Sequence, residues 1–194
     1  MFELITQRLR LRSWRAADRE PFAAMNADPV VMEFFPNRLT RKQSDDLVDR
    51  FEARLSEIGY CPWAAEEQES GAFIGFVGLN PVPHTLPCAP GVEVGWRLDR
   101  TFWGRGYATE AAAEAMRFGF EECELPEIVS FTAAVNRRSR RVMERLGMAR
   151  DIDRGFDHPM IPAGDELRPH VLYRLSKAEW EERQASDAGP EADY

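Results

Sequence analysis

The sequence has few cysteines and histidines, no long apolar run and no excess of positive charge. Its 194 residues include 3 cysteines and 3 histidines, and 25 lysines and arginines stand against 33 acidic residues, for a net charge of −8. Cys61, Cys88 and Cys123 are widely spaced and form no paired motif, which predicts reduced thiols in a cytoplasmic protein, with neither a disulfide framework nor a metal site. The negative charge argues against general nucleic-acid binding and favours the approach of cationic molecules such as amines.

The other absences concern membranes and additional domains. No apolar run approaches the roughly 18 residues that would cross a bilayer. The N-terminus has no basic region followed by an apolar core, so we expect neither a membrane span nor a signal peptide. No segment repeats, and the length fits a single domain. We place this domain at residues 1–184, followed by a small, acidic and disordered tail at residues 185–194.

The chain alternates between helical and strand patterns, which predicts a mixed α/β fold. Strands are expected near 3–13, 62–67, 73–80, 92–98, 128–135, 148–157 and 169–175. Helices are expected near 16–27, 40–58, 107–122 and 136–147. Four prolines within 81–91 predict an irregular loop. The elements would form one sheet of about seven strands with helices against its faces.

The most informative stretch is a glycine-rich turn at residues 103–111 that runs without a break into a helix. Gly104 and Gly106 allow a tight turn and a close approach of anions to the backbone N–H groups. The start of the helix adds unpaired N–H groups and a partial positive charge. This combination predicts a cradle for phosphate or pyrophosphate. A Rossmann site would need a glycine where Thr109 stands, and no P-loop tripeptide follows the turn.

Two further motifs flank this turn in order, a strand at 93–99 and an arginine-rich helix at 136–148. The combination resembles the GNAT superfamily of acetyl-CoA-dependent N-acetyltransferases. Within that superfamily it resembles the branch typified by ribosomal-protein N-terminal acetyltransferases of the RimJ and RimL type. The resemblance covers roughly residues 3–176 and is most specific over 91–148. It implies a GNAT-type mixed, mostly antiparallel twisted sheet, with acetyl-CoA as the co-substrate and no metal.

The resemblance also assigns residues to the coenzyme. In that family the glycine turn binds the pyrophosphate, and the strand before it hydrogen-bonds the pantetheine arm as an added strand would. An asparagine at the start of the following helix contacts the cofactor too. The matching positions are Gly104, Arg105, Gly106, Tyr107, Ala108 and Thr109 for the pyrophosphate, Trp96, Arg97 and Leu98 for the pantetheine, and Asn136. Trp103 replaces the Gln or Arg with which the family's turn motif usually begins.

Five arginines crowd the helix after Asn136, at positions 137, 138, 140, 141 and 145. A run of charge is usually a solvated face, and Asn136 itself has an ordinary alternative as a helix N-cap. The resemblance places this helix near the phosphorylated adenosine end of the coenzyme. We therefore expect one or two of the arginines to pair with the 3′-phosphate, and we name Arg141, although the sequence does not choose among the five.

Transfer of an acetyl group from a thioester needs a neutral amine and a proton for the leaving thiolate. A peptide α-amine has a pKa near 8, against about 10.4 for lysine, so it needs less help. Many family members donate the proton from a tyrosine seven residues after the motif asparagine, where this chain has Met143. The branch it resembles has a serine three residues after that asparagine. We therefore expect Ser139 to be proton donor or thiol ligand, with ordinary first-turn helix chemistry as the alternative.

The general base stays open between several groups. Glu93 lies on the strand beside the expected thioester, where acidic residues serve as the base in several family members, either directly or through water. A solvated strand residue is the alternative. His158 and His170 flank the loop before the last strand, and histidine is a natural base near neutral pH, but surface histidines are often incidental. We rank both below Glu93.

These features predict an N-acetyltransferase that uses acetyl-CoA by direct transfer in a ternary complex, since no cysteine lies in a motif suited to a covalent intermediate. The resemblance favours a protein or peptide N-terminal α-amine as the acceptor. Polyamines, aminoglycosides and amino acids remain open, as does a module that binds acetyl-CoA without turnover. We expect a monomer or homodimer that binds neither nucleic acid nor membrane.

Overall fold

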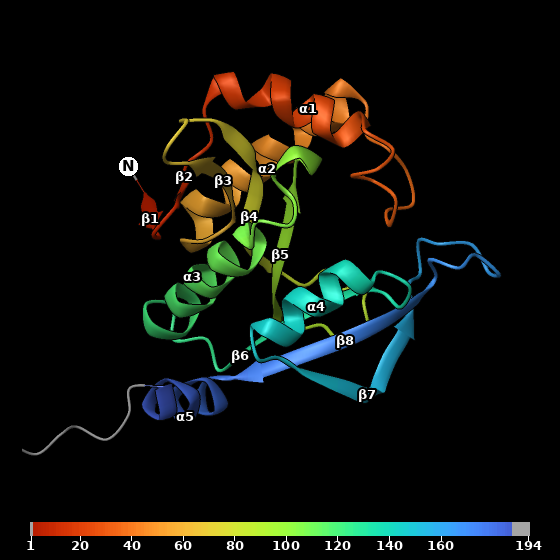
Figure 1. Cartoon of the computed structure of the whole chain (residues 1–194). Helices are drawn as coiled ribbons and strands as arrows, with labels where there is room; N and C mark the ends of the chain where they lie inside the picture. The colour runs from red at the N-terminus through yellow and green to blue at the C-terminus, as the bar shows by residue number, and fades with distance from the viewer. Residues whose placement is uncertain (1, 188–194) are drawn as a thin grey trace, which may run out of the picture.

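A single sheet of eight strands, in the order β1-β2-β3-β4-β5-β6-β8-β7, runs through the computed structural model, which describes residues 2–187 (Figure 1). The strands are β1 (Glu3–Ile5), β2 (Leu9–Arg12), β3 (Pro62–Glu67), β4 (Phe73–Pro81), β5 (Val92–Leu98), β6 (Glu127–Ala133), β7 (Ala149–Asp157) and β8 (Pro169–Ser176). Neighbouring strands pair antiparallel except β5 and β6, which are parallel. The predicted mixed, mostly antiparallel sheet is confirmed.

The helices are α1 (Arg19–Ala27), α2 (Arg41–Ile58), α3 (Tyr107–Glu121), α4 (Arg137–Arg145) and α5 (Lys177–Asp187), with 3-10 turns at Ala16–Asp18 and Arg100–Phe102. The first four lie where the sequence predicted them. Helix α5 was not assigned, and the ring of Trp180 packs on that of Phe120 at 5.3 Å. The part of the predicted tail at residues 188–194 lies outside the described residues. Within the described residues no helix has both the length and the apolar character of a membrane span.

The eighth strand arises because the predicted strand at 3–13 is broken into β1 and β2. The Thr6 N–H donates to the carbonyl of Leu9 at 2.9 Å and closes a turn. Glu110 of α3 holds this turn from outside, since its carboxylate accepts from the Thr6 hydroxyl at 2.6 Å and the Arg8 N–H at 2.8 Å. A partner about a hundred residues away fixes the break, which is why the local pattern did not predict it.

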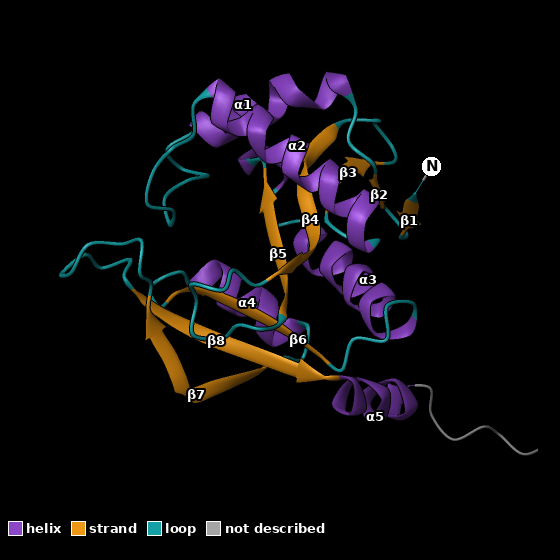
Figure 2. Cartoon of the chain, turned by 180° about the vertical axis from the view of Figure 1, so that it is seen from behind, coloured by secondary structure: helices purple, strands orange, loops and turns teal. Residues whose placement is uncertain are grey.

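Helices cover both faces of β4 and β5. On one face the ring of Phe76 in β4 lies 6.0 Å from Phe22 of α1 and 5.5 Å from Phe51 of α2. On the other face α3 approaches so closely that a Cβ at Gly119 would lie 2.9 Å from the side chain of Leu79. Helix α2 accordingly lies behind β4 in Figure 1 and in front of it in Figure 2.

Strands β5 and β6 diverge at the middle of the sheet. β5 pairs with β4 from Val92 to Leu98, but it pairs with β6 only where Glu93 meets Val129. β6 and β8 run obliquely to the upright β4 and β5 (Figures 1 and 2). The second half of β5 therefore presents one edge to β4 and leaves its other edge without a neighbouring strand.

Candidate active site

The free edge of β5 carries the peptide groups of alternate residues. The Asp99 N–H donates to the Ile74 carbonyl at 2.8 Å and the Val82 N–H to the Gly91 carbonyl at 2.9 Å, which fixes the phase of the antiparallel ladder. In that phase the peptide groups of Glu93, Gly95 and Arg97 face β4. Those of Val94, Trp96 and Leu98 face the diverging side.

Two of these three outward carbonyls already have partners. The Ser130 hydroxyl donates to the Val94 carbonyl at 2.9 Å, and the Trp103 indole N–H donates to the Leu98 carbonyl at 2.8 Å. The peptide groups of Trp96, between them, are the ones placed for an added strand-like ligand. Because the peptide groups of Arg97 face β4, any contact of that residue with a ligand would have to come from its side chain.

The glycine turn adopts the geometry that its sequence predicts. Gly104 and Gly106 have φ values of +77° and +82°, in the left-handed region that favours glycine. A Cβ at Gly104 would meet nothing within 4 Å, so the space beside it is open. Gly106 is the N-cap of α3. The first intrahelical hydrogen bond runs from the Glu110 N–H to the Gly106 carbonyl at 3.0 Å. The amides before that of Glu110 have no partner within the helix.

Side chains hold the turn from outside and leave its amides free. The Tyr107 hydroxyl donates to Glu67 at 2.5 Å, and this hydrogen bond raises the pKa of Tyr107. Arg8 donates to the Arg105 carbonyl at 3.0 Å and lies 4.7 Å above the Tyr107 ring. Arg8 also forms an ion pair with Glu110 at 2.5 Å. The side chain of Tyr107 is therefore occupied structurally, whereas its backbone remains available to an anion.

Asn136 joins the end of β6 to the start of α4. Its side-chain oxygen accepts from the Ser139 N–H at 3.2 Å, so Asn136 caps α4. Its amide nitrogen donates to the Ser139 hydroxyl at 3.1 Å and to the Thr132 hydroxyl at 3.0 Å. Since Ser139 accepts in this contact, its own hydrogen remains free to be donated. Met143 is 1% exposed and belongs to the core.

The arginines of α4 divide into two groups. Arg138 forms an ion pair with Glu33 and lies 4.6 Å from the ring of Trp103. Arg140 donates to the backbone carbonyl of Ala134 at 3.1 Å. These two are held by the protein itself. Arg137, Arg141 and Arg145 are exposed, as is Arg138, but unlike Arg138 they form no ion pair with another of the described residues.

Glu93 occupies a largely enclosed position on the face of β5 that α1 and α2 cover. The Asn80 amide donates to its carboxylate at 2.8 Å, and Arg54 of α2 donates in turn to Asn80. Burial raises the pKa of Glu93 to about 7, although the hydrogen bond from Asn80 and the charge of Arg54 oppose the shift. A carboxylate with a pKa near neutrality suits a general base.

Arg97 lies on the same face of β5. Its Nη1 donates to the Asn26 side-chain oxygen at 2.7 Å, and its guanidinium lies 4.1 Å from the ring of Phe35 and 5.4 Å from that of Phe76. Burial alone lowers the pKa of Arg97 to about 10. Between Glu93 and Arg97, a Cβ at Gly95 would meet nothing within 4 Å.

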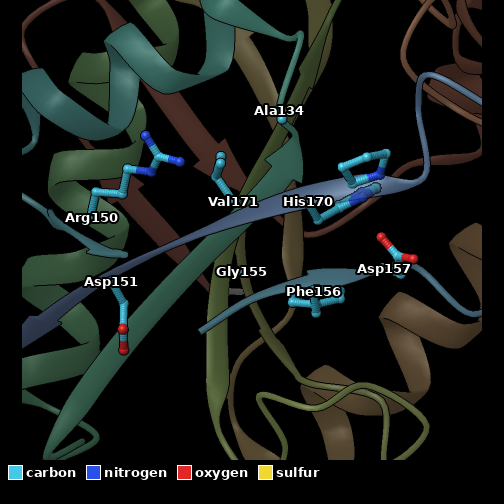
Figure 3. A pocket seen from close by; sticks show the side chains of 9 residues that line it. Ala134, Arg150, Asp151, Gly155, Phe156, Asp157, His170 and Val171 are labelled. Atoms are coloured by element: carbon cyan, nitrogen blue, oxygen red, sulfur yellow. The ribbon is translucent and has the colours of Figure 1, made fainter. Parts of the chain in front are cut away.

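The two candidate histidines lie elsewhere. Their rings are 4.9 Å apart, and burial lowers the pKa of both His158 and His170. His170 lines a cavity of about 460 Å³ at the end of β7 and β8, beside Phe156 (Figure 3). It pairs with Ala133 on β6, four residues from the Val129 that pairs with Glu93, or about 13 Å along the strand. The structure does not bring the histidines together with Glu93.

Burial raises the pKa of all three cysteine thiols, to about 12 for Cys61. They are therefore poor nucleophiles near neutral pH. Among residues 2–187 no three His, Cys, Asp or Glu side chains gather in a way that would hold a metal ion.

Sequence reasoning missed the partners of the two charged side chains on β5. Asn80 and Arg54 surround Glu93, while Asn26 and Phe35 surround Arg97. Asn80 is on the neighbouring strand, but the long loop between β4 and β5 conceals its register. The other three come from α1, α2 and the loop between them, and no local motif marks them.

Comparisons with known proteins agree on the family. A family model described as "Acetyltransferase (GNAT) domain" matches residues 8–149. The FsC-acetyl coenzyme A-N(2)-transacetylase of Aspergillus fumigatus is 30% identical over 184 residues, covering 91% of this chain and 77% of that protein.

Solved structures agree on the fold. An acetyltransferase from Agrobacterium tumefaciens superposes with a TM-score of 0.73 at 29% identity, covering 90% of this chain and 94% of the other. RimL, a ribosomal α-N-protein acetyltransferase solved with coenzyme A, superposes with a TM-score of 0.72 at 14% identity, covering 89% and 96%. The likeness to RimL extends to the fold alone.

Proposed function

This chain belongs to the GNAT acetyltransferase family, and we propose that it carries the acetyl group of acetyl-CoA directly to a primary amine in a ternary complex. The first candidate for the acceptor is the α-amine of a protein or peptide. The observation that carries the proposal is the free edge of β5, which leads from the enclosed carboxylate of Glu93 toward the glycine turn.

The residues present fit the coenzyme that the family uses. The Trp96 peptide groups face the diverging side of β5, where a pantetheine arm would add as a strand does. The open space at Gly104 and the free amides at the start of α3 suit a pyrophosphate. Arg141 is exposed on α4 and is the proposed partner of the 3′-phosphate. Asn136 is buried and already caps α4, so its proposed role is to position Ser139.

Acetyl-CoA supplies the acetyl thioester. Glu93, with a pKa of about 7, accepts the proton of the amine, which for an α-amine has a pKa near 8. These two pKa values differ by about one unit, so proton transfer from the amine to Glu93 is nearly balanced. The Ser139 hydroxyl, which accepts from Asn136, donates a hydrogen bond to the sulfur while the amide C–N bond forms and the C–S bond breaks. The released thiolate then takes its proton from solvent, because a thiol with a pKa of about 8.5 leaves without a strong acid. The raised pKa values of Cys61, Cys88 and Cys123 support direct transfer over a cysteine-bound intermediate.

A small-molecule amine is the second candidate acceptor. It is favoured by the relative named as an N(2)-transacetylase of FsC, since that relative is matched over most of this chain. We also propose the cytoplasm as the location, because the cysteines are free within the described residues and reduced thiols are typical of that compartment.

The first test is a thermal melt of the protein with acetyl-CoA, and with ATP and NAD as controls. Acetyl-CoA at 100 times its Kd should stabilise the fold by about 2.7 kcal/mol, a shift in Tm of roughly 5–10 °C. Release of free thiol on adding an α-amine peptide would then establish turnover. If the protein binds acetyl-CoA but acetylates no amine, it is a coenzyme-binding module. If acetyl-CoA leaves Tm unchanged, acetyl-CoA is not its coenzyme.

A further inference from the structure

Arg97 is an enclosed cation that has no counter-ion among the residues that the structure describes. Its Nε is buried and has no hydrogen-bond partner, and its Nη1 donates only to the neutral amide oxygen of Asn26. Among residues 2–187 no carboxylate lies within ion-pair distance of it, and burial is the single cause of its lowered pKa. Burying an unpaired charge costs free energy unless hydrogen bonds and an opposite charge compensate. An incoming anion would provide that compensation.

The environment fixes the guanidinium in place. The guanidinium carbon of Arg97 lies over the rings of two phenylalanines, 4.1 Å from the centroid of Phe35 and 5.4 Å from that of Phe76. Asn26 is fully buried, and its amide nitrogen donates to the Ser44 hydroxyl at 3.1 Å, which turns its oxygen toward Arg97. A cation held in this way is pre-organised, so little rotamer freedom remains to be lost when a ligand binds.

The position of Arg97 relates it to the proposed acceptor site. Glu93, Gly95 and Arg97 alternate along β5 and therefore share one face. A Cβ at Gly95 would meet nothing within 4 Å, and Gly95 lies midway between the proposed base and Arg97 on β5. Four strand residues span about 13 Å. A ligand lying across Gly95 would thus meet a proton acceptor at one end and a positive charge at the other.

Resting on the proposed acetyl transfer, we infer that Arg97 recognises a carboxylate on the acceptor, so that the preferred acceptor is a primary amine that carries a carboxylate several bonds away. Guanidinium binds carboxylate through parallel N–H donors, and the buried Nε–H supplies a donor that no group in the described part of the chain uses. Two sources present this chemistry, a free amino acid with a side-chain amine and a peptide N-terminus followed by an acidic residue.

The experiment compares matched acceptors that differ only in the carboxylate. Nα-acetyl-lysine is paired with its methylamide, and Ala-Ala-Asp-amide with Ala-Ala-Asn-amide. We expect kcat/KM to be on the order of 100-fold higher for the carboxylate member of at least one pair. The pair that discriminates identifies the source. Equal rates within both pairs would overturn the inference while leaving the acetyl transfer intact.

Two variants test whether Arg97 is the cause. Arg97→Lys keeps the charge but loses the planar fork, and should reduce the discrimination to about 10-fold. Asn26→Asp places a carboxylate against Arg97. Its second oxygen can accept from the Ser44 hydroxyl, which in the wild type accepts from the Asn26 amide, so the variant should keep the fold and lower the discrimination to about 3-fold or less. The Kd of acetyl-CoA should stay unchanged in both. Discrimination that persists in Asn26→Asp, or a parallel loss for both members of a pair, would contradict the inference.

The control is Arg41→Met, which removes an exposed arginine of α2 that pairs with Asp45 and Glu20. It should discriminate as the wild type does. A readout without turnover is the ¹⁵N resonance of the Arg97 Nε–H, which should shift on addition of the carboxylate acceptor and stay in place with the amide. If acetyl-CoA fails to bind the wild type, the proposed function fails. If it binds and the resonance stays in place, the role of Arg97 fails.

Discussion

The two sides of β5 are built in different ways. On the side facing the divergence from β6, the candidate site consists of main-chain groups, namely the Trp96 peptide and the amides at the start of α3, close together in the chain. On the face under α1 and α2 it consists of side chains, Glu93 and Arg97, whose partners come from distant segments. In the proposed function the first side recognises the coenzyme by backbone geometry, and the second recognises the acceptor by charge.

This difference separates a general function from a specific one. A site made of backbone N–H donors requires only glycine at the positions where φ is positive. Many sequences with the same turn can therefore bind the same coenzyme. Side-chain charges that meet across elements can change one at a time without disturbing the fold. We therefore expect substitutions on the coenzyme side to affect all acceptors equally, and those on the side under α1 and α2 to act on chemistry or acceptor choice.

The largest effect is expected from Glu93→Gln. It removes the proposed base and should lower kcat by about 10²- to 10⁴-fold, with the Kd of acetyl-CoA unchanged by calorimetry. In the wild type kcat at saturating amine should rise with pH up to about 7, the pKa of Glu93, and then level off. Glu121→Gln, on the surface of α3, is the control. If the rate of Glu93→Gln still rises with pH up to about 7, another group is the general base.

The same substitution has a consequence for stability. The pKa of Glu93 is raised in the folded state, so the folded protein binds more protons than the unfolded chain at mildly acidic pH. The stabilisation that protonated Glu93 gives to the folded state is complete below the unfolded pKa of about 4.3. It is lost as the pH rises through the pKa of Glu93 in the folded state. Glu93→Gln should flatten this part of the pH dependence of the unfolding free energy.

The next largest effect is expected from Gly104→Ala, which tests the coenzyme side. A side chain in the left-handed region costs about 1–2 kcal/mol, and a methyl group would fill the open space beside the turn. We expect the Kd of acetyl-CoA to rise about 10- to 100-fold. Gly71→Ala is the matched control, because Gly71 has φ +68° and equally open surroundings but lies in the β3–β4 turn. Equal coenzyme binding by both variants would exclude the turn from the site.

A smaller effect is expected from Ser139→Ala. It should lower kcat about 10-fold, less than the roughly 10²- to 10⁴-fold typical of general acids, because the thiolate leaving group needs little assistance. Binding of acetyl-CoA should be retained, and Asn136 still accepts from the backbone N–H of residue 139. Rapid-quench measurement of a single turnover separates this step from product release. Unchanged single-turnover rates would leave Ser139 a structural residue of α4.

The smallest effect is expected from Arg141→Ala. One exposed arginine facing a phosphate should change the Kd of acetyl-CoA by about 3-fold, and less at high salt. Affinity for dephospho-coenzyme A, which lacks the 3′-phosphate, should not change. Arg140→Ala is not an equivalent control, because Arg140 holds the Ala134 carbonyl. If Arg141→Ala weakens both ligands alike, Arg137 or Arg145 becomes the candidate.

The fold could be predicted well because its signals are local. Apolar periodicity located α2, the glycine turn located the start of α3, and the apolar run at 128–135 located β6. The break between β1 and β2 could not be predicted because Glu110 imposes it. Helix α5 could not be predicted either, since its described anchor is the contact between Trp180 and Phe120.

The candidate site divides in the same way. The sequence alone determined the glycine turn, the Asn136 cap and the presence of Glu93, because positive φ, capping and strand alternation depend on neighbouring residues. Only the tertiary structure decided that Glu93 is enclosed enough to titrate near pH 7 and that Arg97 has no counter-ion among residues 2–187. The physical reason is that desolvation and pairing depend on which segments fold over a side chain. Loop closure and helix packing bring those segments from far along the chain.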